Sequence, residues 1–145
     1  SSAATIPVTL KTVTDDLGVK KDVSSFVIPV GATINMDGTA IMQGLATMFI
    51  ASTAGVDLSM VEYLQIVMLA MVASIGAAAV PSAGTITLAL ILSSLGLPLD
   101  AIGLILAVDR ILDMIRTSVN VTGDSAVACI VANSENLLDK EVFNK

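Results

Sequence analysis

Apolar and polar residues follow one another along this chain in long blocks, and the blocks predict an all-α protein. The apolar blocks cover residues 26–51, 60–97 and 101–132. Each is long enough to contain the roughly 20 residues that a helix needs to cross the hydrocarbon core of a bilayer. Ahead of them, residues 5–17 form a shorter helix candidate, with Thr5 as its N-cap and Gly18 as its C-terminal stop.

Polar residues interrupt the first apolar block, which is therefore predicted to be a broken transmembrane helix. Residues 35–39 read Asn-Met-Asp-Gly-Thr. An amide and a carboxylate at this depth of a bilayer are costly unless they face a cavity or an ion path. Pro29, Gly31 and Gly38 are expected to break the helix there and to free backbone carbonyls as ligands. A kinked helix with an internally satisfied polar pair is the alternative.

The second apolar block is predicted to be a re-entrant helical hairpin. Residues 76–84, between its two apolar runs, include no charged residue, although a turn that reaches water is normally polar. The second run, residues 85–97, extends only about 20 Å as a helix, which is too short for a hydrocarbon core of about 30 Å. The turn is therefore expected to stop inside the membrane, buried in protein or lining a cavity. Two ordinary spans joined by an apolar loop are the alternative.

The last apolar block carries a polar stripe on one face of a single transmembrane helix. Its members are Asp109, Asp113, Arg116, Asn120 and Asp124. They follow one another at steps of four, three, four and four residues, so they occupy an arc of about 80°. A buried ion pair between Asp113 and Arg116 would be purely structural, but it leaves Asn120 and Asp124 without a cationic partner. The stripe is therefore predicted to be functional.

Composition places the chain in a membrane and excludes several functions. Hydrophobic residues make up 54% of the sequence and charged residues 14%, and the mean hydropathy is +0.89. The net charge of −6 comes without a cluster of Lys and Arg, so nucleic acid is not an expected partner. The absence of histidine excludes a histidine triad and argues against a zinc site. An aspartyl hydrolase using Asp37 and Asp113 has nothing to place a water between them, so no enzymatic activity is expected.

The polar residues match the chemistry of a small zwitterion with an acidic side chain. Arg116 can grip a carboxylate with two parallel hydrogen bonds, and Asp113 can accept a hydrogen bond from an ammonium group. Oxygens of Asn35, Asp37 and Asp124, with backbone carbonyls, can surround a hard monovalent cation, for which sodium is the expected identity. A proton carried by one of Asp37, Asp113 or Asp124 is the alternative. Cation binding neutralises carboxylates and prepares the site for substrate, which couples the two ligands.

Three motifs carry a family resemblance. Residues 31–40 read Gly-Ala-Thr-Ile-Asn-Met-Asp-Gly-Thr-Ala, residues 73–84 surround the apolar turn, and residues 113–124 run from Asp-Met-Ile-Arg-Thr to Asn-Val-Thr-Gly-Asp. Together, and in this order, they closely resemble the glutamate/aspartate transporter family of dicarboxylate/amino acid:cation symporters. The opening residues 1–7 resemble that family's first hairpin tip, entered halfway, so an upstream segment is expected.

The resemblance implies that residues 1–145 are the C-terminal part of one transport domain. Its parts would be the second half of a first hairpin (1–18), a broken helix (22–54), a second re-entrant hairpin (60–97), a last transmembrane helix (101–134) and a polar tail (135–145). The expected function is secondary active symport of glutamate or aspartate with sodium. In the family, mobile transport domains move like elevators against a static trimeric scaffold, and the second hairpin acts as a gate.

The resemblance also implies which residues bind each ligand. Substrate would be bound by Ser2, Met36, Thr39, Val80, Gly84, Asp113, Arg116, Thr117 and Asn120. Sodium would be bound by Gly31, Thr33, Asn35, Asp37, Ser74, Ile75, Ala77, Asn120 and Asp124. Within this second set, one ion would use Asn120 and Asp124, a second would lie between Thr33 and the second hairpin, and a third would use Asp37 with ligands from an upstream helix.

The expected partners are an acidic amino acid, the lipid bilayer and the N-terminal scaffold and transport helices of the same protein, in a homotrimer. The expected location is a multi-pass position in a cell membrane, the prokaryotic inner or plasma membrane. Met42 stands where relatives often have tyrosine, which leaves potassium counter-transport open. A proton-coupled glutamate or dicarboxylate symporter remains an alternative, as does a channel or structural membrane subunit without a transported substrate.

Overall fold

The computed structural model describes residues 1–76 and 83–145, and over these residues the chain is helical, with one isolated antiparallel bridge between Val19 and Leu138. The elements are α1 (Ser2–Lys11), the π-helix η1 (Thr12–Asp16), α2 (Lys21–Ile34), α3 (Asp37–Thr53), α4 (Met60–Gly76), α5 (Ala83–Ser94), the 3₁₀-helix η2 (Leu99–Ala101), α6 (Ile102–Leu106), α7 (Asp109–Ser134) and α8 (Lys140–Phe143). The all-α prediction is confirmed for the described residues. None of the helices described there is both long enough and apolar enough to cross a membrane.

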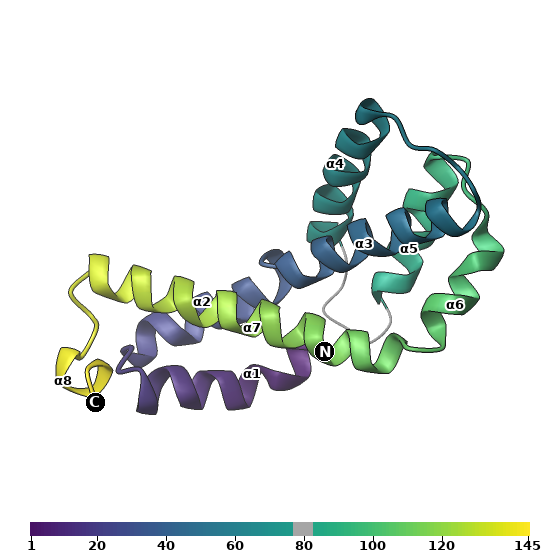
Figure 1. Ribbon diagram of the computed structural model, residues 1–145. Helices are drawn as coiled ribbons and strands as arrows, with labels where there is room; N and C mark the ends of the chain where they lie inside the picture. The colour runs from purple at the N-terminus through teal and green to yellow at the C-terminus, as the bar shows by residue number, and fades with distance from the viewer. Residues whose placement is uncertain (77–82) are drawn as a thin grey trace.

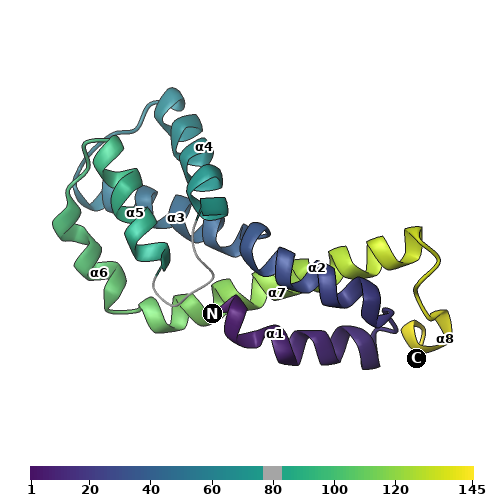
Figure 2. The ribbon, with the colours of Figure 1, turned by 180° about the vertical axis from the view of Figure 1, so that it is seen from behind.

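The molecule is elongated and has two ends. Figure 1 shows α1, α2 and the C-terminal part of α7 side by side at one end, with α8 beyond them, and α3 to α6 at the other; the reverse view in Figure 2 agrees. Each end has its own apolar core. The first core comprises Val13, Val19, Val23, Ile28, Ala128 and Ala132. The second comprises Met42, Ala46, Ile50, Ala51, Leu88, Leu92, Leu97 and Ile105. The two ends meet where α2 gives way to α3 beside the middle of α7.

The first helix starts earlier than its sequence suggests. Ser1, not Thr5, is the N-cap, because its hydroxyl accepts a hydrogen bond from the backbone N–H of Ala4 at 3.2 Å. Thr5 lies inside α1 and donates to the carbonyl of Ser2 at 2.8 Å, as hydroxyls inside helices do. The predicted stop at Gly18 is confirmed. Its φ of +70° is a conformation that glycine adopts without strain.

The predicted interruption between α2 and α3 is confirmed, but its cause is different from the one expected. Only Asn35 and Met36 leave the helical conformation. Pro29 and Gly31 lie within α2 and Gly38 lies within α3, so these residues do not break the helix. The two glycines serve close packing instead, because both face α7. The break ends the regular hydrogen-bond ladder of α2: the backbone N–H of Asn35 still donates to the Gly31 carbonyl at 2.8 Å, but that of Met36 donates to the carbonyl of Ile34 at 3.1 Å, outside the helical pattern.

Helices α4 and α5 pack against each other and against α3. Helix α4 begins with a reciprocal cap: the Glu62 carboxylate accepts from the backbone N–H and the hydroxyl of Ser59, both at 2.7 Å. Helix α5 contributes Leu88 and Leu92 to the second core. The apolar turn that the sequence predicts at the tip of this hairpin lies mostly outside the described residues.

The predicted continuous helix over residues 101–134 is wrong at its start. The chain turns at Ala107 and Val108, where Val108 has a non-helical conformation (φ −117°, ψ 3°), and α7 begins at Asp109. The turn lets α6 place Ile105 in the second core while α7 continues along α2. Because residues 101–108 are almost uniformly apolar, their sequence contains no signal for this bend.

Candidate functional site

The polar stripe on α7 is buried in the described structure, as its spacing predicts. Side chains of Asp109, Arg116, Asn120 and Asp124 are all buried, and that of Asp113 is 14% exposed. Ile111, Ile115 and Val119, on the remaining surface of the helix, are exposed. The helix therefore turns its polar face into the protein and its apolar face outward, which is the reverse of a helix on the surface of a soluble domain.

One group of polar residues, the amide cluster, consists of Asn35, Asn120 and Asp124. The side-chain Nδ2 of Asn35 donates to Asp124 Oδ1 at 2.9 Å and to the carbonyl of Asn120 at 3.2 Å. The Oδ1 of Asn120 accepts from the backbone N–H of Gly38 at 2.8 Å, at the start of α3. The break between α2 and α3 is thus fixed to α7 by hydrogen bonds from both of its sides.

A second group, the arginine cluster, consists of Asp113, Arg116 and Gly84. Arg116 Nη2 forms an ion pair with Asp113 Oδ1. Arg116 Nη1 is buried and has no hydrogen-bond partner among the described residues. Gly84, in the first turn of α5, faces this guanidinium so closely that a β-carbon at position 84 would lie 3.1 Å from Cζ of Arg116. The hairpin therefore reaches the arginine through a position that has no side chain.

Other residues predicted to contact substrate surround Asn120. Its Nδ2 lies 3.5 Å from the Ser2 hydroxyl, 3.3 Å from the Met36 sulfur and 3.4 Å from the Thr39 hydroxyl, all of which belong to buried residues. Thr117 accepts a hydrogen bond from the Ser1 nitrogen at 3.3 Å. These contacts bring residues 2, 36, 39 and 120 together, with Thr117 beside Ser1, from three separate segments of the chain. Val80 lies outside the described residues.

The residues predicted to bind cations are only partly brought together. Gly31 lies against Asp124, since a β-carbon at position 31 would be 2.9 Å from Cγ of that carboxylate. Thr33 is exposed near the end of α2, and the side chain of Asp37 is exposed at the start of α3. In the described residues no three His, Cys, Asp or Glu side chains form a group that could hold a metal ion.

The predicted contribution of the second hairpin to cation binding lies at the end of α4. Ser74 is buried there and Ile75 is exposed, and α4 contacts α2, which carries Thr33. In the described part of the chain, no hydrogen bond joins the side chains of Thr33 and Ser74. Ala77, the remaining member of the set, lies outside the described residues.

Sequence reasoning missed two features of the site. The first is the contact of Gly123 with the Asn35 side chain and of Gly38 with the Arg116 carbonyl group. The second is Gln43, which is fully buried in α3 and donates to the Thr87 hydroxyl of α5. An amide within the apolar run of α3 was a visible signal for the second feature. No sequence signal shows what a glycine will face.

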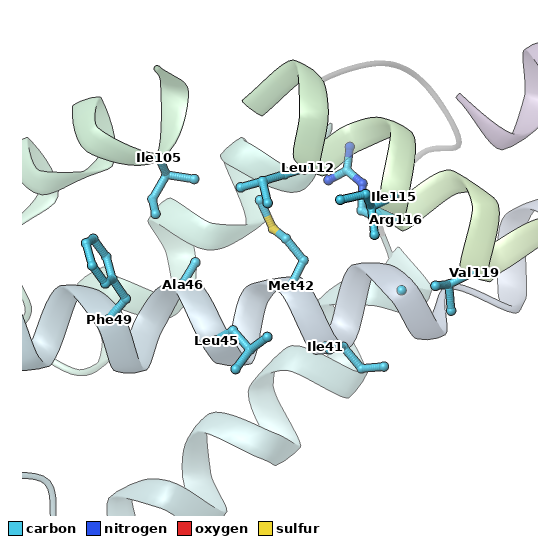
Figure 3. A pocket seen from close by; sticks show the side chains of 11 residues that line it. Ile41, Met42, Leu45, Ala46, Phe49, Ile105, Leu112, Ile115, Arg116 and Val119 are labelled. Carbon is cyan, nitrogen blue, oxygen red and sulfur yellow. The ribbon is translucent and has the colours of Figure 1, made fainter. Parts of the chain in front are cut away.

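An apolar pocket of about 280 Å³ lies beside the arginine cluster, between α3, α6 and α7. Figure 3 shows Met42 of α3 and Leu112 of α7 approaching one another in it, with Phe49 and Ile105 at one side. Arg116 is the charged residue among its lining residues. Because the rest of the lining offers no partner for charge, this pocket does not suit a zwitterion, and the polar clusters provide the better site.

The family model and the individual relatives that match this chain agree with one another. The model of the sodium:dicarboxylate symporter family matches residues 1–134. The chain is 52% identical over 131 residues to an excitatory amino acid transporter of Caenorhabditis elegans, covering 90% of this chain and 26% of that protein. It is 53% identical over 131 residues to excitatory amino acid transporter 2 of Mus musculus, covering 90% and 23%. It is 49% identical over all 145 residues to excitatory amino acid transporter 1 of Rattus norvegicus, covering 26% of that protein.

The chain thus spans about a quarter of the length of the curated relatives that it matches. These relatives come from animals, so the expectation of a prokaryotic membrane finds no support.

Proposed function

Because the chain belongs to the sodium:dicarboxylate symporter family, we propose that it forms the substrate- and sodium-binding part of a transporter that moves acidic amino acids across a membrane together with sodium. The observation that carries this proposal is the buried guanidinium of Arg116, which has one nitrogen unsatisfied by any described residue. An unsatisfied buried donor on a charged group is costly, and a ligand carboxylate removes that cost.

The arginine cluster supports recognition of an amino acid with an acidic side chain. Without substrate, Asp113 and Arg116 neutralise each other. A substrate carboxylate that binds the planar guanidinium, including its unpaired Nη1, displaces Asp113 in part, and Asp113 then accepts from the substrate ammonium. Two ion pairs replace one, and the second carboxylate of the substrate is left for neutral hydrogen-bond donors such as the Asn120 amide. A dicarboxylate without an ammonium group lacks the second pair, so an amino acid is the better ligand.

The residues around Asn120 would complete the substrate site. Asn120 contacts Ser2, Met36 and Thr39. Thr117 follows Arg116 in the sequence, and Gly84 brings the backbone of α5 to Arg116. Val80 belongs to this proposed set through the family resemblance alone.

The amide cluster supports cation binding. Carboxylate, amide and backbone oxygens are the ligands that hard cations prefer, and Asn35, Asn120, Asp124 and the carbonyl of Gly31 supply them at one crossing of α2 and α7. Thr33 with Ser74, Ile75 and Ala77 would hold a second sodium between α2 and α4. Asp37, exposed in this structure, would need ligands from another part of the protein.

Asn120 gives the two ligands a physical connection. Its backbone carbonyl accepts from Asn35 in the amide cluster, while its Nδ2 lies against residues proposed to line the substrate site. A cation that binds Asn35 and Asp124 therefore acts on groups that are hydrogen-bonded to Asn120. Coupling of this kind is reciprocal: the substrate raises the affinity for sodium by the same factor as sodium raises the affinity for substrate.

Exposed apolar side chains support a place in a membrane. Helix α4 exposes Met60, Val61, Leu64, Met68 and Val72 along its length. Such a continuous apolar surface suits lipid or further helices of the same protein. We include in the proposal a multi-pass membrane location, a gate formed by α4 and α5, elevator movement and a homotrimer, all of which rest on the family resemblance.

Uptake of labelled aspartate into liposomes containing the full-length protein tests the proposed function. A sodium gradient should drive uptake, and a proton gradient of equal size should not. Uptake driven only by protons would replace sodium with a proton as the coupled ion. Sodium flux without any uptake of aspartate would identify a channel and contradict the proposal.

A further inference from the structure

Helix α2 and helix α7 cross through a reciprocal pair of glycine contacts. Gly31 of α2 faces the carboxylate of Asp124. Gly123, the preceding residue of α7, faces the amide of Asn35, which follows the last residue of α2. Each helix thus contributes one glycine and receives one polar side chain of the amide cluster. The contact at Gly31 involves a residue already proposed as a ligand, whereas Gly123 has no role in the proposed function.

The space at Gly123 is occupied by one side chain. A β-carbon at position 123 would lie 2.5 Å from Nδ2, 3.4 Å from Cγ and 3.5 Å from Oδ1 of Asn35, and these are the three nearest atoms. Carbon and nitrogen atoms do not approach to 2.5 Å without a bond, so the Asn35 amide would have to move. In its present position this amide donates both of its N–H groups, to Asp124 and to the carbonyl of Asn120.

We propose that Gly123 is a positioning residue for sodium: its missing side chain leaves the space that holds the Asn35 amide against Asp124. This inference rests on the proposed function for the identity of the ion. With Nδ2 committed to two acceptors, Oδ1 is the atom of the amide that remains to accept a cation. A side chain at position 123 turns the amide away, so Asp124 loses a hydrogen bond and the cation loses an oriented oxygen.

A role in helix packing alone makes a different prediction. If Gly123 only allowed α2 and α7 to approach, a methyl group there would lower stability without changing the response to sodium, and trimming Asn35 would not relieve it. If Gly123 positions Asn35, the effect of the methyl group depends on the Asn35 side chain. Removing that side chain then removes the effect.

The first experiment compares sodium binding by three forms of the full-length protein, purified in detergent without aspartate. These are the wild type, Gly123→Ala and Gly44→Ala, the last a control because a β-carbon at Gly44 of α3 meets no atom within 4 Å in the part of the chain that the structure describes. The melting temperature is measured while sodium chloride replaces choline chloride at constant ionic strength. We expect the half-saturating sodium concentration to rise about tenfold or more for Gly123→Ala, the effect of losing a hydrogen bond to a charged group. It should not change for Gly44→Ala.

The second experiment tests rescue. Asn35→Ala is compared with the double variant Asn35→Ala/Gly123→Ala in sodium-free buffer, where the inference predicts that the double variant melts at the same temperature or higher, since alanine is the better helix former. If Gly123→Ala alone does not fold, the double variant should recover the yield and melting temperature of Asn35→Ala. A double variant that remains worse than Asn35→Ala overturns the inference.

The outcomes separate the inference from the proposed function. A wild-type protein that sodium does not stabilise relative to choline contradicts the proposed sodium coupling itself. A wild-type protein that responds to sodium, together with equal responses of Gly123→Ala and Gly44→Ala, overturns the role of Gly123 and leaves the proposed function standing.

Discussion

The amide cluster and the arginine cluster lie one turn apart on α7, yet their hydrogen bonds are completed to different degrees. In the amide cluster, Asn35 and Asn120 bind groups from α3 and α7, and none of the cluster's three side chains has a buried polar atom that lacks a partner among the described residues. In the arginine cluster, Arg116 keeps a buried nitrogen without one. A polar group that the protein satisfies internally is already in position, whereas an unsatisfied one needs a ligand. The same helix therefore carries one ordered site and one that substrate completes.

Arg116→Ala should have the largest effect, and it should affect the arginine cluster alone. Loss of the guanidinium should weaken the binding of acidic amino acids about a hundredfold or more, because it removes one partner of a buried charge pair. Sodium binding without aspartate should change little, since the amide cluster does not include Arg116. Aspartate affinity and sodium affinity of the full-length protein, measured separately, check both statements.

Arg116→Lys refines this prediction. The lysine keeps the charge but lacks the planar fork, so its aspartate affinity should lie between those of the wild type and Arg116→Ala. Aspartate transport that is intact in Arg116→Ala would show that the substrate assignment is wrong.

Asp124→Asn tests the amide cluster. The amide oxygen of the new side chain can still accept the hydrogen bond from Asn35, so the fold should persist while the negative charge is lost. The half-saturating sodium concentration should rise about ten- to a hundredfold. Asp22→Asn, an exposed change in the first turn of α2, is the matched control. Equal sodium affinities of the two variants would exclude Asp124 as a ligand.

Gly84→Ala should move the Arg116 side chain without removing it. A methyl group at position 84 meets the guanidinium, so the side chain must shift and lose part of its carboxylate contact. Aspartate affinity should fall about tenfold, while sodium affinity without aspartate stays constant. Gly76→Ala, where a β-carbon at the end of α4 meets no atom of residues 1–76 and 83–145 within 4 Å, should change neither. An equal loss of aspartate affinity in both variants would point to hairpin backbone effects instead.

Ser59→Ala should have the smallest effect of these variants. It shows how far a loss of helix stability alone changes the affinities for sodium and aspartate. It removes the two hydrogen bonds of the Ser59 hydroxyl at the start of α4, to the Glu62 carboxylate and from the Glu62 backbone N–H, while the backbone N–H of residue 59 can still donate to Glu62. Stability should fall by about 1 kcal/mol, seen as a small drop in melting temperature. Affinities for sodium and aspartate should stay at wild-type values, and a change in either would mean that helix stability alone affects binding.

Much of the site could be predicted from the sequence because one helix carries most of it. Spacing along α7 fixes which residues share a face, and the structure buries Arg116, Asn120 and Asp124 as that spacing predicts. The break at Asn35 was also predictable, because an amide and a carboxylate interrupt an apolar run there.

What could not be predicted depends on contacts between segments. Gly31 and Gly38 were interpreted as helix breakers, but each faces a residue of α7 more than 70 positions away, and a sequence does not show such an approach. The bend at Val108 has the same origin, since it arises from the packing of Ile105 against α3 and α5 in the second core.

Calorimetric titration of aspartate into the full-length protein, with sodium or choline as the only monovalent cation, tests whether sodium and substrate bind in a coupled manner. If a cation binds at the amide cluster and the substrate completes the arginine cluster, heat of binding should appear in sodium and be absent or much weaker in choline. Equal binding in the two salts, or no binding in either, would contradict the account.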